Sequence, residues 1–267
     1  HASSLGSRVT FLSVAGRDDV AEYAETKLSE YDVECEILRD ESRPTTLKMR
    51  YRAAGKTLLR VSYLRQHAIS NDLAKKTLAR VKQKIAICDI VIFSDFNYGC
   101  LPQNLVDEII MLGEQQGVLM VADSQASSQI SDVSRFKGMT LLTPTEREAR
   151  LAQRDYESGL VVLAEKLATK SNASHVAITL GEEGLLVLTK DGSGQWKMDN
   201  LPAFNSLSKD ASGAGDSFLT CASLALCVGE NIWRSVYLGS LAAGIQVSRL
   251  GNTPLKVQDF INEIEYF

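Results

Sequence analysis

The most informative part of the sequence is Asp210-Ala211-Ser212-Gly213-Ala214-Gly215-Asp216, which is followed at once by an apolar run at residues 217–227 that predicts a helix. Glycine lets the backbone turn tightly and approach a ligand closely. The N–H groups in the first turn of a helix have no partner inside the helix and attract an anion. The stretch therefore predicts an anion site at a helix start, with the carboxylate of Asp216 in the first turn.

An anion site beside a carboxylate suits the transfer of a phosphoryl group. The amides would stabilise charge on the phosphoryl group, and Asp216 would accept the proton of the attacking hydroxyl. We expect the helix dipole to keep Asp216 acidic, which makes it a weak base, and a loose transition state tolerates a weak base. A capped helix start with an acidic first turn accounts for the same residues equally well.

Strand and helix patterns alternate along the rest of the chain. Apolar runs predict strands at residues 9–14, 34–38, 87–94, 118–122, 139–142, 175–180, 184–189 and 195–199. Amphipathic spacing predicts helices at 20–30, 71–84, 103–115, from 145, 159–170, 214–227, 232–249 and 257–266. This order predicts a three-layer α/β/α fold with a mostly parallel central sheet, as one domain over residues 1–267. Ile90-Val91-Ile92-Phe93 reads as a strand buried in that sheet.

Residues 43–63 break the alternation of strands and helices. Basic and apolar residues alternate there, and Ala54-Gly55-Lys56 predicts a turn, so we expect a β-hairpin that projects from the sheet as a lid. Four basic residues mark the hairpin: Lys48, Arg50, Arg52 and Arg60. They either face an anionic substrate or form an ordinary solvated surface.

The composition excludes several classes of protein. The chain has 267 residues, a net charge of −4, 45% apolar and 23% charged residues, which excludes a disordered chain and gives no basic excess for nucleic acid. The apolar runs are too short and interrupted to cross a membrane. The 5 cysteines have no metal-site spacing, so we expect reduced thiols in a cytoplasmic protein.

Two further segments lie where a predicted strand ends. Thr143-Pro144-Thr145-Glu146-Arg147-Glu148 opens a helix, and its acidic residues either cap that helix or hold a hydrated Mg²⁺. Thr179-Leu180-Gly181-Glu182-Glu183-Gly184 is either a plain turn or a backbone turn that approaches a ligand. Asp95 and Asp123 also end strands, at the edge where α/β sheets bind ligands, although an Asp there more often caps a helix.

Residues 210–216 resemble the D-T-x-G-A-G-D signature of the ribokinase-like (PfkB) sugar kinases. Other parts of the chain match this family in the family's order, over essentially its whole length. They are the T-x-x-K lid strand at residues 43–50, the T-P-N-x-x-E segment at 143–148, the T-x-G-x-x-G turn at 179–184 and the adenine-side segment at 239–253. Within the family, the R-P-T-T-x-K-x-R lid, residues 93–99 and residues 135–138 are most similar to kinase domains that act on heptose 7-phosphate in ADP-heptose synthesis.

The resemblance implies an ATP- and Mg²⁺-dependent kinase that phosphorylates a hydroxyl of a sugar or sugar phosphate. Asp216 would be the base, and the amides of Gly213, Ala214 and Gly215 would form the anion hole. The other implied roles are nucleotide contacts from Thr179, Gly181, Gly184 and, near the base, Asn252, sugar contacts from Lys48, Arg50, Asp95 and Asp210, and a water-mediated Mg²⁺ contact from Glu148. The lid of this superfamily often forms a dimer interface, so we expect a homodimer.

Several positions depart from the family pattern. Thr145 replaces the Asn of N-x-x-E, Tyr98 replaces the Lys of G-K-G, and Asp123-Ser124-Gln125 stands where D-P-K is expected. Residues 1–6 resemble the end of the family's first helix, so we expect a piece of a longer polypeptide that lacks the first strand and helix of the domain. These departures favour the alternative hypothesis of a non-catalytic module that binds a sugar or a nucleotide.

Overall fold

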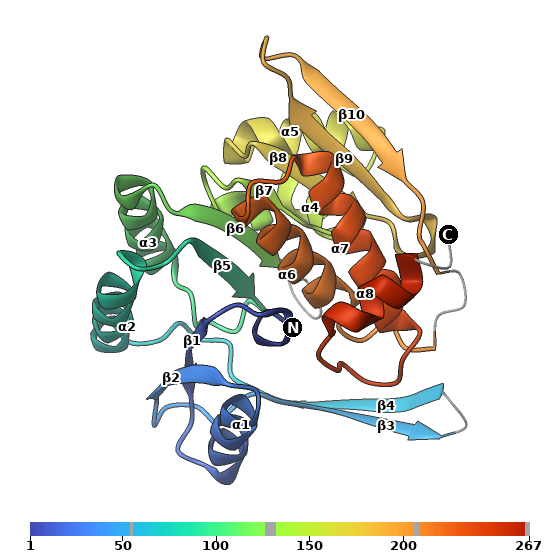
Figure 1. Ribbon diagram of the computed structural model, residues 1–267. Coiled ribbons are helices and arrows are strands. Elements are labelled where there is room, and N and C mark those ends of the chain that lie inside the picture. Colours follow the sequence, from blue (N-terminus) through green and yellow to red (C-terminus); the bar gives the residue numbers. More distant parts are fainter. Residues whose placement is uncertain (54–55, 126–131, 206–208, 265–267) are drawn as a thin grey trace.

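The structure is a computed structural model that describes residues 1–53, 56–125, 132–205 and 209–264 (Figure 1). The strands of these residues are β1 (Val9–Ala15), β2 (Val33–Arg39), β3 (Leu47–Ala53), β4 (Lys56–Tyr63), β5 (Ile90–Asp95), β6 (Leu119–Ser124), β7 (Leu141–Leu142), β8 (His175–Thr179), β9 (Leu185–Lys190) and β10 (Trp196–Leu201). Ala54 and Gly55 of the predicted turn and Glu265 and Tyr266 of the last predicted helix lie outside the described residues.

The helices alternate with these strands, as the sequence predicts. They are α1 (Asp19–Glu30), α2 (Asn71–Ile85), α3 (Gln103–Gln116), α4 (Glu146–Gln153), α5 (Leu160–Ser171), α6 (Ala214–Cys227), α7 (Ile232–Val247) and α8 (Val257–Ile264). Short 3₁₀ turns are η1 (Ser3–Leu5), η2 (Val133–Arg135) and η3 (Gly181–Glu183). No helix in the part of the chain that the structure describes is long and apolar enough to cross a membrane, and the cytoplasmic location stays a prediction.

The central sheet has the order β10-β9-β8-β7-β6-β5, in which β5 to β8 pair in parallel, β9 pairs antiparallel with β8, and β10 pairs antiparallel with β9. Alternate residues of a strand face opposite sides, and both sides of this sheet are covered. Met120 and Ala122 pack in the core beneath helices α2 to α5, whereas Val121 packs in a second core with Phe218 of α6 and Val236 of α7. Figure 1 shows the resulting three layers, which confirm the predicted fold class.

The first two strands differ from the predicted single sheet. β1 and β2 pair only with each other among the described residues, as a separate parallel pair beside α1 (Figure 1). β5 is therefore the outer strand of the central sheet as described. Its residues Ile90, Val91 and Ile92 are only half-buried, in contrast to the buried strand that the apolar run predicts.

The hairpin β3–β4 lies where the sequence predicts a β-hairpin and has two different faces, and its role as a lid stays a prediction. Its register pairs Lys48 with Ser62 and Arg50 with Arg60 on one face, and Met49 with Val61 and Tyr51 with Leu59 on the other. Because strand residues two apart share a face, Lys48, Arg50 and Arg52 lie on the same side of β3. Figure 1 shows the hairpin extending away from β1 and β2, past the ends of α6 and α8.

Candidate active site

The turn before α6 has the backbone that the glycine-rich stretch predicts. Gly213 is the N-cap residue of α6, with φ 81° and ψ 3°, and no side chain caps the first turn. A Cβ atom at Gly213 would lie 2.3 Å from Cγ of Asn252, so the position requires glycine. A Cβ atom at Gly215 would meet nothing within 4 Å. The surface beside Gly215 is therefore open, which leaves room for an anion at the start of α6, while the N–H of Ala214 donates to the carbonyl of Ala211 over 3.3 Å.

Asp216 lies in this first turn, but its acidity differs from the expectation. Burial raises the pKa of its carboxyl group, and the positive charge of Lys48 and a hydrogen bond from Asn252 lower it by less, so the net shift is upward. The Nδ2 atom of Asn252 donates that bond to Oδ2 of Asp216 over 3.3 Å. The expectation that the helix dipole keeps Asp216 acidic is therefore wrong, because removal of the charged form from water has the larger effect.

Asn252 therefore contacts both Gly213 and Asp216. The family resemblance implies a place for it near the nucleotide base. The structure instead brings its amide onto the turn before α6, where it hydrogen-bonds the carboxylate of the expected base. Any contact between Asn252 and a nucleotide base stays a prediction.

Asp210 fixes the entry to the turn and binds the lid. Its Oδ1 atom accepts the N–H of Ser212 and its Oδ2 atom accepts the N–H of Gly251, each over 3.1 Å. The guanidinium of Arg52 on β3 forms an ion pair with the same carboxylate. Burial opposes the charged form, but these bonds outweigh it and lower the pKa of Asp210 to about 2. Asp210 is thus a charged residue that connects the lid to the turn, and its expected sugar contact stays a prediction.

Gln246 of α7 supports the same turn from behind. Its side chain is fully buried, and its Nε2 atom donates to the carbonyl oxygens of Ser212 over 3.2 Å and Gly251 over 2.6 Å. Backbone carbonyls that are buried need such partners. Gln246 belongs to the segment 239–253 that the family resemblance identifies, but a single amide inside an apolar helix is no signal in the sequence alone.

Glu148 lies at the start of α4 and is buried, with 7% of its surface exposed. Thr145 is the N-cap residue, and its N–H and Oγ1 both donate to Oε2 of Glu148 over 2.8 Å. This reciprocal arrangement is a capping box, as the capping interpretation of the segment predicts. Thr179 lies next to it, because its N–H donates to the carbonyl of Pro144 over 2.9 Å. The segments 143–148 and 179–184 therefore meet.

The turn 179–184 has glycines at two constrained positions. Gly181 has φ 64°, and a Cβ atom added there would meet nothing within 4 Å. Gly184 has φ 96°, and a Cβ atom added there would lie 2.0 Å from the carbonyl oxygen of Leu201. Gly184 therefore serves a close approach of two backbones inside the protein. Gly181 faces open space, where a ligand has access.

Asp123 is a candidate residue outside the set that the family resemblance implies. It lies within β6 near the carboxyl end of that strand and caps none of the described helices, with 7% of its surface exposed. Burial, followed by repulsion from Glu148 and Asp216, raises the pKa of its carboxyl group to about 8. Its place at a strand end is the signal in the sequence, but only the fold brings the two other carboxylates near it.

A family model described as the pfkB family of carbohydrate kinases matches residues 1–258. The chain belongs to the pfkB family of carbohydrate kinases. It is 28% identical to the bifunctional protein HldE of Geotalea uraniireducens (strain Rf4) over 265 residues, which are 98% of this chain and 52% of that protein. It is 29% identical to HldE of Desulfatibacillum aliphaticivorans over 254 residues, or 93% of this chain and 50% of that protein. The chain thus spans about half the length of these relatives.

Solved structures show the same fold for this carbohydrate kinase. Phosphofructokinase-2 from Escherichia coli in complex with potassium superposes with a TM-score of 0.80 at 17% identity, covering 99% of this chain and 84% of that chain. Ribokinase from Thermotoga maritima superposes with a TM-score of 0.76 at 20% identity and the same two coverages. The ribokinase-like architecture that the sequence predicts is therefore confirmed.

Asp95 of the carbohydrate kinase has its partners inside the chain. Its carboxylate is 4% exposed, and its Oδ2 atom forms an ion pair with Nη2 of Arg135 over 2.8 Å. Ser124 donates to Oδ2 over 3.2 Å and the N–H of Asn97 donates to Oδ1 over 2.9 Å. Its expected sugar contact stays a prediction beside this structural role.

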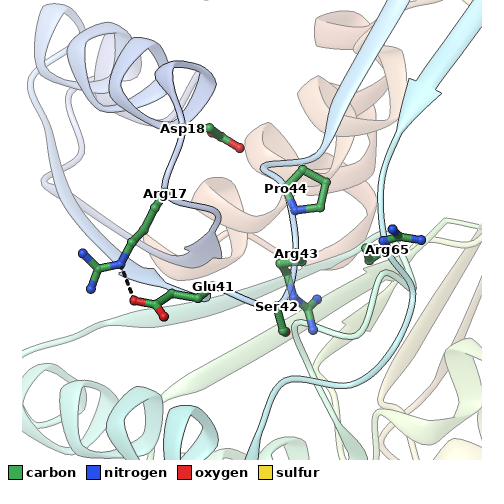
Figure 2. Close-up of a pocket in the computed structure, with 7 residues that line it drawn as sticks. All are labelled: Arg17, Asp18, Glu41, Ser42, Arg43, Pro44 and Arg65. Carbon is green, nitrogen blue, oxygen red and sulfur yellow. Dashed lines mark ion pairs between the residues drawn. The ribbon is translucent and has the colours of Figure 1, made fainter.

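A pocket of about 340 Å³ lies at the base of the lid, separate from the turn before α6. Figure 2 shows its lining residues, which are Arg17, Asp18, Glu41, Ser42, Arg43, Pro44 and Arg65. None of them belongs to the predicted site. Arg17 pairs with Glu41 over 3.0 Å at its rim (Figure 2), and Arg43 forms a buried ion pair with Asp40.

Proposed function

We propose that this carbohydrate kinase transfers the γ-phosphoryl group of ATP to a hydroxyl of a sugar phosphate similar to heptose 7-phosphate. The observation that carries the proposal is the half-buried carboxylate of Asp216 beside the uncapped first turn of α6, in the field of Lys48 from the lid. A base, an anion site and a cation from the lid then converge on one place. Phosphoryl transfer needs all three, as a proton acceptor and as charge stabilisation.

Asp216 takes the proton of the acceptor hydroxyl in this proposal. Its raised pKa makes it a stronger base than an ordinary carboxylate. The amides of Gly213, Ala214 and Gly215 stabilise the negative charge of the phosphoryl group as it moves. Thr179 and Gly181 line the nucleotide side, with Gly184 holding the turn that presents them.

Asp123 and Glu148 fit the Mg²⁺ ion that kinases of this kind use. Both are buried carboxylates, and burial followed by repulsion from Glu148 and Asp216 raises the pKa of Asp123 to about 8, so a cation beside these carboxylates would reduce that repulsion. Mg²⁺ in kinases keeps several waters and binds one or two carboxylates plus phosphates, and Asp123 and Glu148 could supply those carboxylates. The ion would neutralise charge on the phosphates of the nucleotide.

The basic residues of the lid are the reason for proposing a sugar phosphate as the phosphoryl acceptor. Lys48 and Arg50 share the lid face that carries Arg52, and Arg52 contacts Asp210 at the turn before α6. This supports the interpretation of the basic face as part of the site. The likeness of the lid to that of heptose-7-phosphate kinase domains supports the class of acceptor, and relatives named HldE are 28% and 29% identical over nearly the whole chain.

The opposite face of the lid supports the proposed homodimer. Tyr51, Leu59 and Tyr63 on this face are each more than half exposed. Exposed apolar side chains gathered on one face are typical of an interface. Sedimentation velocity of the parent and of Leu59→Asp tests this, because a dimer should dissociate in the variant, and a monomeric parent would contradict it.

The proposed reaction is tested by ADP release from Mg·ATP with a panel of acceptors that includes heptose 7-phosphate, heptose and fructose 6-phosphate. We expect turnover that depends on a sugar phosphate and falls by about 10²- to 10⁴-fold in Asp216→Asn. Asp199→Asn, on the exposed surface of β10, is the matched control and should retain parental turnover.

Two results would count against the proposal. Equal turnover in Asp216→Asn and the parent would remove Asp216 as the base. Nucleotide binding without turnover on any acceptor would favour the non-catalytic module, a reading that the substitutions at Thr145 and Tyr98 support.

A further inference from the structure

Two aromatic rings hold the lysine of the lid. The Nζ atom of Lys48 lies 4.8 Å from the ring centroid of Phe96 and 5.0 Å from that of Tyr98. The two rings stack with centroids 6.3 Å apart and an interplanar angle of 16°. These are distances at which the face of an aromatic ring attracts a cation. Lys48 is also close enough to Asp216 for its charge to lower the pKa of that carboxyl group.

The loop that carries the rings has a fixed backbone. Asn97, between them, has φ 58° and donates its N–H to Oδ1 of Asp95 over 2.9 Å. Its Nδ2 atom donates to Oγ of Ser124 over 3.1 Å and to the carbonyl of Gln125 over 3.0 Å. A residue in the left-handed region persists only when its surroundings hold it there, and here three hydrogen bonds from Asn97 do so.

The same loop is bonded to the base of the lid. Buried Arg43, which precedes β3, donates from Nη1 to the carbonyl of Tyr98 over 2.9 Å. Its Nη2 atom donates to the carbonyl of His67, which follows β4, over 2.7 Å. Arg43 thus joins both strands of the lid to the backbone of Tyr98, so the lysine on β3 and the rings that receive it belong to one connected frame.

We propose that Phe96 and Tyr98 are positioning residues, whose stacked rings hold the ammonium group of Lys48 at the acceptor side of Asp216. The inference rests on the proposed function for its effect on turnover. A lysine has four flexible bonds in its side chain, and an ammonium group placed by rings loses less of its freedom when the acceptor binds. Tyr98 then has a role of its own where related kinases carry a lysine.

The first test compares Tyr98→Leu with Tyr98→Phe, because the second variant keeps the ring. We expect Tyr98→Leu to raise the KM for the acceptor by about 3- to 10-fold with the KM for ATP unchanged, and Tyr98→Phe to resemble the parent. Phe96→Leu should act like Tyr98→Leu, and because Phe96 is only half-buried it tests the idea if Tyr98→Leu does not fold.

A double-mutant cycle separates positioning from a general structural role. In the background Lys48→Met, the change Tyr98→Leu should have no further effect on the KM for the acceptor, since the rings act through the lysine. Additive effects of the two changes would overturn the inference. So would a Tyr98→Phe variant as impaired as Tyr98→Leu.

Chemical labelling tests the contact without any turnover. Reductive methylation followed by mass spectrometry should modify Lys48 more slowly than exposed Lys82 in the parent, and the difference should shrink in Tyr98→Leu but persist in Tyr98→Phe. Equal rates for Lys48 in all three proteins would overturn the inference. A parent that labels as expected but phosphorylates no sugar would instead contradict the proposed function alone.

Discussion

The guanidinium of Arg52 on the lid forms an ion pair with the carboxylate of Asp210, which begins the turn before α6. The side chains of the two residues are 27% and 12% exposed. Because Asp210 also accepts the backbone N–H groups of Ser212 and Gly251, the position of the lid and the shape of the anion site share one carboxylate. This carboxylate therefore couples the position of the lid to the shape of the turn.

Arg52→Gln should weaken this coupling. We expect kcat/KM to fall by about 3- to 10-fold, the equivalent of about 1 kcal/mol for a partly buried ion pair, and the deficit to shrink as salt screens the parental pair. Steady-state kinetics at low and high salt measure both effects. The control is Arg234→Gln, which removes the exposed ion pair between Arg234 on α7 and Glu230 and should leave kcat/KM unchanged. A loss of similar size in both variants would count against the coupling.

Replacement of Gly213 and of Gly215 by alanine should affect different properties, the first the stability of the fold and the second the KM for ATP. Gly213→Ala forces a side chain into a left-handed position and against Asn252, so we expect it to destabilise the fold by about 1–3 kcal/mol. Gly215→Ala meets no atom of the protein. It should keep the parental melting temperature and raise the KM for ATP, because the methyl group projects into the anion site. Thermal unfolding and kinetics of the two variants decide this, and a destabilised Gly215→Ala would contradict it.

The pKa of about 8 at Asp123 predicts a pH-dependent stability. The unfolded chain releases this proton near pH 4 and the folded chain near pH 8, so the folded state binds more protons between these values. The contribution of Asp123 to stability is thus fully present below pH 4 and is lost as the pH rises to about 8. In EDTA, Asp123→Asn should not lose this stability. The free energy of unfolding of the variant minus that of the parent should therefore increase from pH 5 to pH 8.

Urea unfolding of the two proteins across this pH range measures the effect. Curves of free energy against pH that run parallel would show that Asp123 does not titrate there. Addition of Mg²⁺ at pH 8 should raise the melting temperature of the parent more than that of Asp123→Asn, because a cation replaces the proton beside this carboxylate.

Gln246→Leu should affect the turn from the opposite side. It leaves the carbonyls of Ser212 and Gly251 without their donor, and we expect a loss of about 2 kcal/mol in stability together with weaker nucleotide binding. Chemical unfolding and nucleotide titration measure the two effects. Gln258→Leu on the exposed side of α8 is the matched control. Unchanged nucleotide affinity in Gln246→Leu would show that the turn keeps its shape without this amide.

Local patterns account for much of this kinase. The alternation of apolar runs predicts the layers, the basic hairpin predicts the lid, and the glycines before α6 predict its uncapped start, because each is a property of a few consecutive residues. The positive φ of Gly213 and the place of Asp216 in the first turn follow from the consecutive residues of the stretch 210–216. The same reasoning leaves helix capping and Mg²⁺ binding open for residues 143–148, and the structure shows a capping box between Thr145 and Glu148.

The tertiary structure decided the features that depend on segments far apart in the chain. The acidity of Asp216 is a balance between burial and the charge of Lys48, and the shift at Asp123 needs Glu148 and Asp216 beside it. Periodicity contains no information on which strand ends meet, and an electrostatic field depends on distance in space and on exclusion of water. The sequence by itself therefore determined the local shape of the turn and the lid, whereas the protonation of its carboxylates and the contacts of Arg52 and Lys48 were decided only by the fold.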